Sequence, residues 1–401
     1  MNEKLVKHEN KITNKKTYLV NSKIWKKNSR MWGDKMHRIC SYVAMFPPTL
    51  ANYFIENYSE ENDVILDTFS GRGTTVLEAR MLNRKAYAID LNPFAYVLSK
   101  AKSNSFLLEE VLDELKKWEV QYNSYNFDIE IDDEMEIYYS RANLKQITFI
   151  KEFYGKNWRT LDEIQNFILA ITLGLMHGPQ RKSGDSMYFS LSMSNCISMS
   201  KNYVKNFANK KNLKRPEDNI FSKIENRIKN ILKGSKYSKV QAKVLYGNSL
   251  EISNYIDVKP KLIFTSPPYL NIINYTQQNW IKMWLLGYDS KDKNNDLKLD
   301  DKHNIKNYIE FMKKYLISIS KIMDKNSTLA MVIGDVQKVN EVYSFDKMWN
   351  ENLRFYVKDI VLTEIYTDPI NQNNKATNSM GNRAGKSTRI DKIYIFKKVI
   401  K

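Results

Sequence analysis

The sequence predicts a doubly wound α/β sheet that is interrupted by a mostly helical insert and closed by an antiparallel hairpin. Three observations favour this fold class. From Pro47 onward, short apolar runs alternate with amphipathic helical stretches, which is typical of strands and helices packed in layers. The alternation stops over residues 105–240, where helical patterns dominate, and it resumes at Val244. The last two apolar runs flank a long polar segment, so we expect them to pair as antiparallel strands.

The expected elements follow from apolar runs bounded by Gly, Asp and Pro, and from helical periodicity between them. Before the insert we expect helix, strand, helix and strand at 49–58, 64–66, 74–82 and 86–89. Within the insert we expect helices at 105–120, 143–154, 160–176 and 201–233. After it we expect strands at 244–246, 262–264, 329–333, 357–366 and 390–397. The chain is accordingly divided into a basic N-terminal arm, a first core part, the insert and a second core part, at 1–30, 31–104, 105–240 and 241–401.

The charge of the 401-residue chain points to a polyanionic partner. Its formal net charge is +18, and Lys and Arg gather in residues 1–38 and 201–245, whereas acidic residues gather in 105–140. Such sorting indicates faces with different roles, and nucleic acid is the polyanion that a basic face most often binds. A basic surface that only faces solvent is the alternative.

Composition narrows the class of protein further. The hydrophobic fraction of 42% can fill a large core. No apolar run approaches the roughly 20 residues of a membrane span, and the Lys-rich first forty residues do not resemble a secretory signal. Two cysteines, Cys40 and Cys196, provide neither a disulfide framework nor a metal cluster. We therefore expect a cytoplasmic protein with no membrane partner and no metal.

A nucleotide-binding turn is predicted where the strand at 64–66 ends. Asp67 is followed by Phe69-Ser70-Gly71-Arg72-Gly73 and then by a helix start at Thr74. The glycines allow a tight turn and close approach of a ligand to the backbone. The spacing is neither that of a Walker loop nor that of the three-glycine dinucleotide motif. Asp90 ends the next strand, where a carboxylate can accept both ribose hydroxyls, although a plain strand-end cap is equally compatible with it.

A second candidate site, Ser266-Pro267-Pro268-Tyr269, directly follows the strand at 262–264. Two consecutive prolines fix the backbone and remove two donors, so that carbonyl oxygens point where the turn directs them. A hydroxyl and a flat ring beside them could hold a planar base. A rigid loop with a surface Tyr is the alternative for this motif taken alone.

These two motifs resemble those of the DNA amino-methyltransferases, the cytosine-N4 and adenine-N6 family. The resemblance implies a Rossmann-like class I methyltransferase core with S-adenosylmethionine as cofactor. It extends to residues 37–48, 247–249 and 333–335, the last resembling the strand end behind the target-base pocket. The cofactor-binding residues that it implies are Tyr42, Phe46, Pro47, Asp67, Phe69, Gly71, Gly73, Thr74, Asp90, Asn248 and Ser249.

The same resemblance implies that Ser266, Pro267, Pro268 and Tyr269 are the catalytic residues. The target amino group would donate to the Ser266 hydroxyl and the Pro267 carbonyl, and the methyl group would be transferred in line. The base would flip out of the duplex and stack on Tyr269. Asn248 departs from the family, which often has Asp there. Ser at the first position of the tetrad favours cytosine N4 over adenine N6.

The helical insert is the expected reader of double-stranded DNA, unless its helices merely cover the core. We expect its basic residues to contact phosphates. The candidates are Arg181, Lys182, Lys201, Lys205, Lys210 and Lys211. Two other classes remain open, namely an amino-methyltransferase of RNA or protein and a catalytically silent DNA-binding protein. A separate restriction endonuclease is a further hypothetical partner, because enzymes of this family commonly protect DNA from one.

Overall fold

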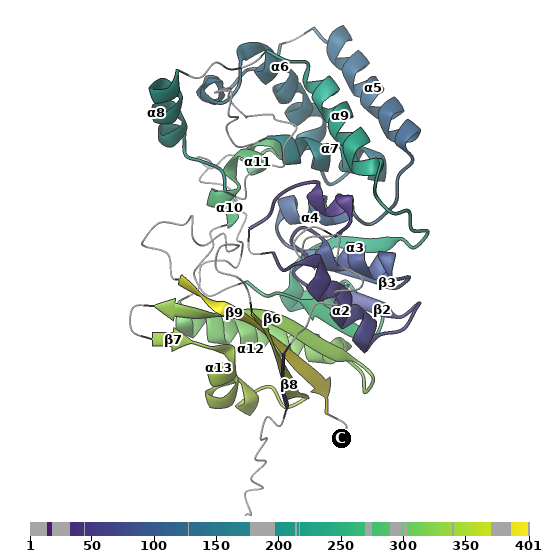
Figure 1. Cartoon of the computed structure of the whole chain (residues 1–401), viewed down its shortest axis with the longest axis vertical. Coiled ribbons are helices and arrows are strands. Elements are labelled where there is room, and N and C mark those ends of the chain that lie inside the picture. The colour runs from purple at the N-terminus through teal and green to yellow at the C-terminus, as the bar shows by residue number, and fades with distance from the viewer. Residues whose placement is uncertain are drawn as a thin grey trace, which may run out of the picture.

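The computed structural model describes residues 14–17, 33–43, 45–126, 128–176, 197–212, 215, 217–268, 275–288, 299, 304–338, 341–369 and 386–399. These residues form a nine-stranded mixed sheet and a separate layer of helices beside one of its ends (Figure 1). In this part of the chain no helix combines the length and the apolar character that a membrane span needs.

The sheet has the strand order β1-β8-β9-β6-β5-β2-β3-β4, with β7 paired to β6. Its strands are β1 (Asn14–Thr17), β2 (Val64–Asp67), β3 (Lys85–Asp90), β4 (Ala242–Tyr246), β5 (Leu262–Thr265), β6 (Thr328–Lys338), β7 (Glu341–Tyr343), β8 (Ile360–Pro369) and β9 (Lys386–Lys398). Strands β2 to β6 run parallel, and β9 is antiparallel to both of its neighbours. The order reverses between β2 and β5, and ligands bind at such a switch point in open α/β sheets. The expected Rossmann-like class I core and its C-terminal hairpin are confirmed.

Helices cover both faces of the sheet. On one face, α2 (Pro48–Tyr58) and α3 (Thr74–Met81) pack on the apolar side chains of β2, β3 and β5. On the other, α12 (Ile305–Ile322) and α13 (Phe345–Glu351) bury a second cluster that includes Tyr315 and Trp349. Each strand in the middle of the sheet is therefore buried on both sides, as its continuous apolar sequence requires.

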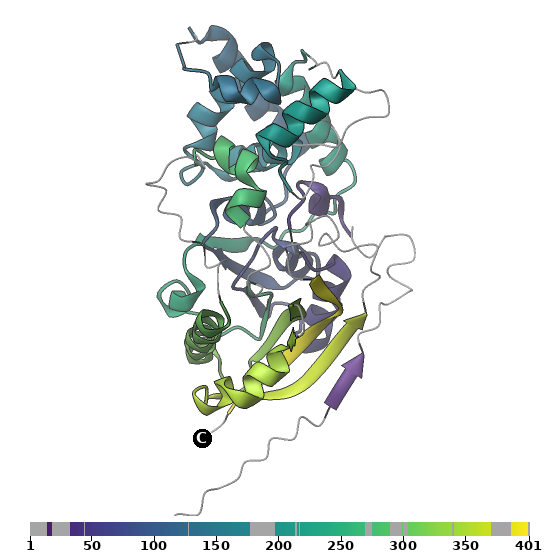
Figure 2. The same ribbon diagram turned by 90° about the vertical axis from the view of Figure 1, so that its left-hand side faces the viewer.

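The helical layer consists of α5 (Leu108–Ser124), α6 (Arg141–Ile150), α7 (Glu163–Leu175), α8 (Lys201–Lys211) and α9 (Ile220–Leu232). It shares one apolar cluster with α4 (Pro93–Lys100) of the sheet region. The short helices α10 (Tyr275–Gln278) and α11 (Trp280–Leu285) lie beside this layer, although they follow the strand β5 in sequence (Figures 1 and 2). Met283, Trp284 and Leu285 of α11 belong to the same cluster.

The predicted elements occur in the expected order, but several boundaries differ, as in α5, β8 and β9, and the largest difference is at the end of β6. The strand expected to end at Ile333 continues to Lys338, because β9 and β7 both pair with its second half. Residues 333–335 therefore lie inside β6, at a register shift between Gly334 and Val336. Within the basic arm, residues 14–17 form a parallel edge strand on β8, which the sequence did not indicate.

Candidate functional site

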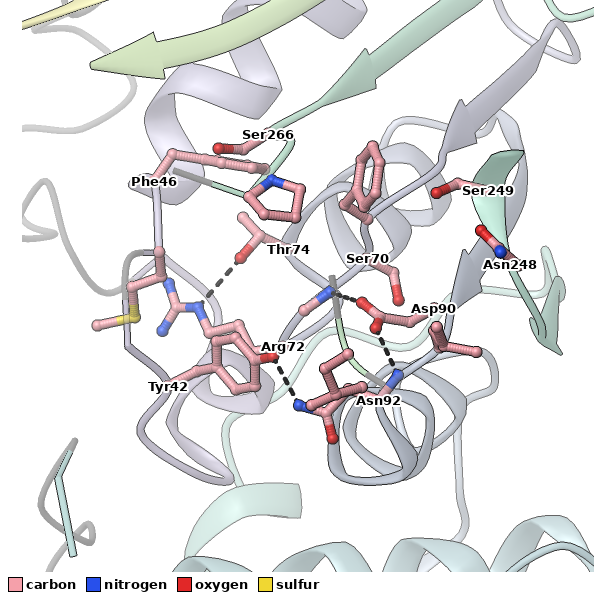
Figure 3. A pocket seen from close by; sticks show the side chains of 16 residues that line it. Tyr42, Phe46, Ser70, Arg72, Thr74, Asp90, Asn92, Asn248, Ser249 and Ser266 are labelled. Atoms are coloured by element: carbon pink, nitrogen blue, oxygen red, sulfur yellow. Dashed lines mark hydrogen bonds between the residues drawn. The ribbon is translucent and has the colours of Figure 1, made fainter. Parts of the chain in front are cut away.

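A cavity opens at the carboxyl ends of β2, β3, β4 and β5 (Figure 3). It is lined by Tyr42, Met45, Phe46, Phe69, Ser70, Gly71, Arg72, Thr74, Asp90, Leu91, Asn92, Asn248, Ser249, Ser266, Pro268 and Leu299. Residues from both predicted motifs thus share one cavity.

The Gly turn is held in a left-handed conformation at both glycines, with φ of 50° at Gly71 and 74° at Gly73. The Gly71 amide donates to Asp90 Oδ2 at 2.9 Å. The Ser99 hydroxyl donates to Ser70 Oγ at 2.8 Å and to the Gly71 carbonyl at 3.2 Å. These contacts attach the turn to the end of β3 and to α4, and they leave its outer side facing the cavity.

Asp90 is half-buried and lines the cavity wall. Its two carboxylate oxygens accept from the backbone amides of Gly71 and Asn92, each at 2.9 Å. Burial raises the pKa of Asp90 to about 6, and the two amides act in the opposite direction. Each oxygen keeps a further lone pair, so the carboxylate can still accept from a ligand hydroxyl when it is ionised.

Asp67 lies beneath the turn and does not line the cavity. Its Oδ1 atom accepts from the Thr265 hydroxyl at 2.7 Å and from the Phe69 amide at 3.2 Å. The Thr265 hydroxyl oxygen also accepts from the Phe69 amide at 3.1 Å. Burial raises the pKa of Asp67 to about 6. Asp67 thus connects the Gly turn to the last residue of β5, immediately before Ser266.

The segment before α2 supplies the aromatic wall of the cavity. The Tyr42 ring lies so close to Gly71 that a Cβ atom there would be 3.3 Å from Tyr42 Cε1. The Tyr42 hydroxyl accepts from the Asn92 side-chain amide at 3.4 Å. Phe46 packs edge-on against Phe264 of β5, with ring centroids 5.2 Å apart. Flat, apolar rings at this wall suit a ligand with exposed carbon and sulfur atoms.

Ser266 and Pro268 bring the second motif to the same cavity. The Ser266 hydroxyl donates to the Val332 carbonyl of β6 at 2.9 Å. This bond follows from the parallel register, in which Thr265 pairs with Met331. The hydroxyl hydrogen is therefore directed away from the cavity, and the oxygen lone pairs are available to a ligand N–H. Pro267 is buried beside them, and Tyr269 lies outside the described residues.

Most of the predicted cofactor residues meet at the cavity, and a few stand behind it. Pro47, Asp67, Gly73 and Pro267 are not among its lining residues. Asn248 lines it and uses its side-chain oxygen to accept from the Leu250 amide at 3.0 Å. The lining residues that sequence reasoning missed are Met45, Ser70, Arg72, Leu91, Asn92 and Leu299. For Arg72, the position between the two glycines was the available signal.

Some of the basic residues predicted to contact DNA phosphates belong to the part of the chain that the structure describes. They lie on α8, at the edge of the helical layer (Figure 1). Lys205 and Lys210 are exposed, whereas Lys201 pairs with Glu134. Tyr203 is 54% exposed and stacks on Phe207, with centroids 6.0 Å apart. Arg181 and Lys182 lie outside the described residues, as does the side chain of Lys211. Within the described chain, no group of three or more His, Cys, Asp or Glu side chains could hold a metal ion.

Comparison with known proteins finds similarity to DNA methylases. A family model for DNA methylases of the N6 and N4 type matches residues 1–101. The Type II methyltransferase M.MjaII of Methanocaldococcus jannaschii is 21% identical over 389 residues, covering 75% of this chain and 72% of that protein. The Type II methyltransferase M.BsoBI of Geobacillus stearothermophilus is 25% identical over 289 residues, covering 64% of this chain and 53% of that protein.

Among solved structures, TrmN from Thermus thermophilus aligns with a TM-score of 0.33 and 8% identity, over 88% of this chain and 49% of that one. A likeness at this level says nothing about substrate. The family model and the two Type II methyltransferases agree with the motifs that meet at the cavity. These likenesses support a DNA amino-methyltransferase, with S-adenosylmethionine as the methyl donor.

Proposed function

We propose that this protein is a site-specific DNA methyltransferase that methylates the exocyclic N4 of cytosine in duplex DNA. One observation carries the proposal: Ser266 and Pro268 line the same cavity as Gly71 and Asp90. A methyl donor held by the Gly turn would lie beside a base held by the tetrad. Such proximity supplies much of the acceleration of a direct in-line transfer, with no covalent enzyme intermediate.

The cavity fits the methyl donor. In Figure 3, Asn248 and Ser249 stand at one end, Tyr42 and Phe46 at the other, and Asp90 between them. We assign the adenine to the first end, the ribose hydroxyls to Asp90 and the methionine end to the aromatic wall. Phe69, Gly71 and Thr74 would contact the donor along the turn, while Pro47, Asp67 and Gly73 would shape the site from behind.

The pKa of Asp90 allows a test of the proposal that Asp90 binds the ribose hydroxyls. Because burial raises this pKa to about 6, the carboxyl group protonates as the pH falls through that value and loses acceptor capacity. We expect the affinity for S-adenosylhomocysteine to fall roughly tenfold between pH 7 and pH 5, since binding favours the ionised form. Calorimetry across this range measures it. Asp90→Asn should bind more weakly at pH 7 and respond less to pH; an equal pH response in both proteins would contradict the assignment.

The residues of the tetrad would orient the target amino group. When bound, S-adenosylmethionine supplies an electrophilic methyl group. The amino nitrogen of cytosine is conjugated with the ring and is a poor nucleophile. Its hydrogens would be accepted by Ser266 Oγ, whose own hydrogen is donated to the Val332 carbonyl, and by the Pro267 carbonyl. This arrangement would turn the nitrogen lone pair toward the methyl group, while Tyr269 stacks on the flipped base. The proton that the methylated nitrogen must lose would leave along one of these hydrogen bonds and pass to solvent.

Mass spectrometry of nucleosides tests the reaction and the target base. Unmethylated plasmid is incubated with the purified protein and labelled S-adenosylmethionine, with Tyr269→Ala as a parallel variant. We expect N4-methylcytosine from the wild type and a strong reduction in the variant. Detection of N6-methyladenine instead would support the same mechanism with adenine, rather than cytosine, as the target base. No modified nucleoside in DNA, with cofactor bound, would contradict a DNA substrate and direct the search to RNA or protein.

Residues 105–240 are proposed to read the DNA, with α8, α10 and α11 in contact with it and the acidic helix α5 facing away from it. Val204 is the buried residue among the described side chains of α8, so packing leaves most of that helix exposed. The Ser198 amide donates to the Gln278 carbonyl at 2.6 Å, and Trp280 Nε1 donates to the Met199 carbonyl at 3.3 Å. These bonds join the start of α8 to the helices that follow the tetrad.

Removing two exposed lysines from α8 tests the DNA contact. In a Lys205→Ala/Lys210→Ala variant we expect weaker binding to every duplex sequence, because phosphate contacts carry no sequence information. The slope of log affinity against log salt should fall by about one per lysine. Fluorescence anisotropy at several salt concentrations measures both. Lys116→Ala/Lys117→Ala, on the acidic helix α5, is the matched control and should leave the slope unchanged.

A cytoplasmic role beside a separate restriction endonuclease completes the proposal. Methylation by this protein would protect host DNA within a restriction-modification or phage-defence system. The test is digestion of host DNA by a nuclease encoded nearby, with and without this gene. Unchanged digestion would contradict the protective role without affecting the methyl transfer.

A further inference from the structure

Arg72 is an almost fully buried cation that lines the cavity, with 2% of its surface exposed. Its Nε atom donates to Thr74 Oγ1 at 3.1 Å, and its Nη1 atom donates to the His37 carbonyl at 3.3 Å. Both acceptors are uncharged oxygens. They hold the guanidinium in place at the cavity wall.

Other ionisable side chains are buried close to Arg72. Lys102 is buried and donates to the Arg72 carbonyl. Burial lowers the pKa of Lys102 and of His37, and the charge of Arg72 lowers both further. Glu78 Oε1 is hydrogen-bonded to His37 Nε2 at 2.7 Å, and Glu78 Oε2 accepts from the Asn52 side-chain amide at 2.9 Å. Burial raises the pKa of Glu78 to about 7. An anion that entered this end of the cavity would be stabilised by the guanidinium at short range.

The position of Arg72 along the cavity identifies the anion. Figure 3 shows Arg72 with Tyr42 and Phe46, at the end opposite Asn248 and Ser249. A donor with its adenine near Asn248 and its ribose at Asp90 directs its amino-acid end toward Arg72. The α-carboxylate is the one anionic group of that donor. A guanidinium can bind it with two parallel hydrogen bonds.

We propose that Arg72 binds the α-carboxylate of the methionine moiety and thereby selects the complete methyl donor over adenosine thioethers that lack this group. The inference rests on the proposed orientation of the cofactor. It makes Arg72 a specificity-determining residue for the donor, distinct from the residues that hold adenine, ribose or the target base.

Calorimetry with two ligands tests the assignment without any turnover. The ligands are S-adenosylhomocysteine and its decarboxylated analogue, and the proteins are the wild type, Arg72→Met and Arg72→Lys. We expect the wild type to prefer the carboxylated ligand by about 10- to 100-fold. Arg72→Met should lose that preference by weakening only the carboxylated ligand. Arg72→Lys should retain part of it, because it keeps the charge without the planar fork.

Controls separate this role from a structural one. Arg84 is also buried and donates to the carbonyls of Ser59 and Leu82, away from the cavity, so Arg84→Met should change stability but not ligand preference. Equal losses for both ligands in Arg72→Met would overturn the inference, as would equal affinities in the wild type. If Arg72→Met does not fold, the ligand preferences of Arg72→Lys and of the wild type test the inference instead. Failure of the wild type to bind S-adenosylhomocysteine would contradict the proposed function itself.

Discussion

Ser266→Ala is expected to lower the rate of methyl transfer about 100- to 1000-fold, the range found when one preorganised hydrogen bond to a reacting group is removed. The substitution removes the oxygen that would accept from the target amino group and also frees the Val332 carbonyl. The affinity for S-adenosylhomocysteine should stay within about twofold, because the loss affects the orientation of the base rather than the donor. Single-turnover kinetics and calorimetry measure the two quantities.

Two variants show whether the loss is chemical or structural. Ser266→Asn can donate to Val332 through its amide nitrogen and accept through its oxygen, so it should recover part of the rate. Ser327→Ala removes a similar bond, from a buried hydroxyl to the Pro260 carbonyl at 2.6 Å, at the other end of β5 and β6. It should leave the rate unchanged. A rate for Ser266→Ala close to that of the wild type would contradict the proposed role.

The fold was predictable wherever local periodicity decides it. Central strands such as Leu262–Thr265 are continuous apolar runs, because both of their faces are buried. The end of β6 was not predictable. Its second half is stabilised by pairing with β9 and β7, and a strand held by distant partners has no local signal at its boundary. The same reason explains the edge strand at residues 14–17, which depends on β8.

The site was predictable from topology more than from single residues. Gly71, Asp90, Asn248 and Ser266 lie at or just beyond the carboxyl ends of parallel strands, and such ends meet at one edge of the sheet. Whether a residue lines the cavity or supports it depends on side-chain direction. Asp67 turns toward Thr265 and stays beneath the turn, which periodicity cannot indicate.

The position of Arg72 and the contacts of α11 could not be predicted for a related reason. The burial of Arg72 requires the segment near His37 to fold over the turn, and these residues are 35 positions apart. Helix α11 follows β5 but packs in the helical layer, and Gly155 permits this contact. A Cβ atom at Gly155 would lie 1.9 Å from the Leu285 carbonyl oxygen. Such long-range approaches appear only once the layers are assembled.

Gly73→Ala is expected to lower the free energy of unfolding by about 2–5 kcal/mol and to weaken binding of S-adenosylhomocysteine. Alanine at φ of 74° costs about 1–2 kcal/mol, because its Cβ atom is crowded by the backbone. That Cβ atom would also lie 2.8 Å from Ser99 Cα of α4, and such overpacking costs about 1–3 kcal/mol. Relief requires the turn and α4 to separate, which would move the Gly71 amide away from Asp90.

Gly234→Ala provides the matched control for Gly73→Ala. A Cβ atom at Gly234 would meet Lys35 Cε at 2.7 Å, but this is the far end of a flexible side chain that can turn into solvent. Chemical unfolding and calorimetry should therefore separate the two alanine variants clearly. Gly234→Ala should resemble the wild type in both measurements. Wild-type cofactor affinity in Gly73→Ala would mean that the Gly turn tolerates a side chain, and that its close contact with α4 does not hold the cofactor site in shape.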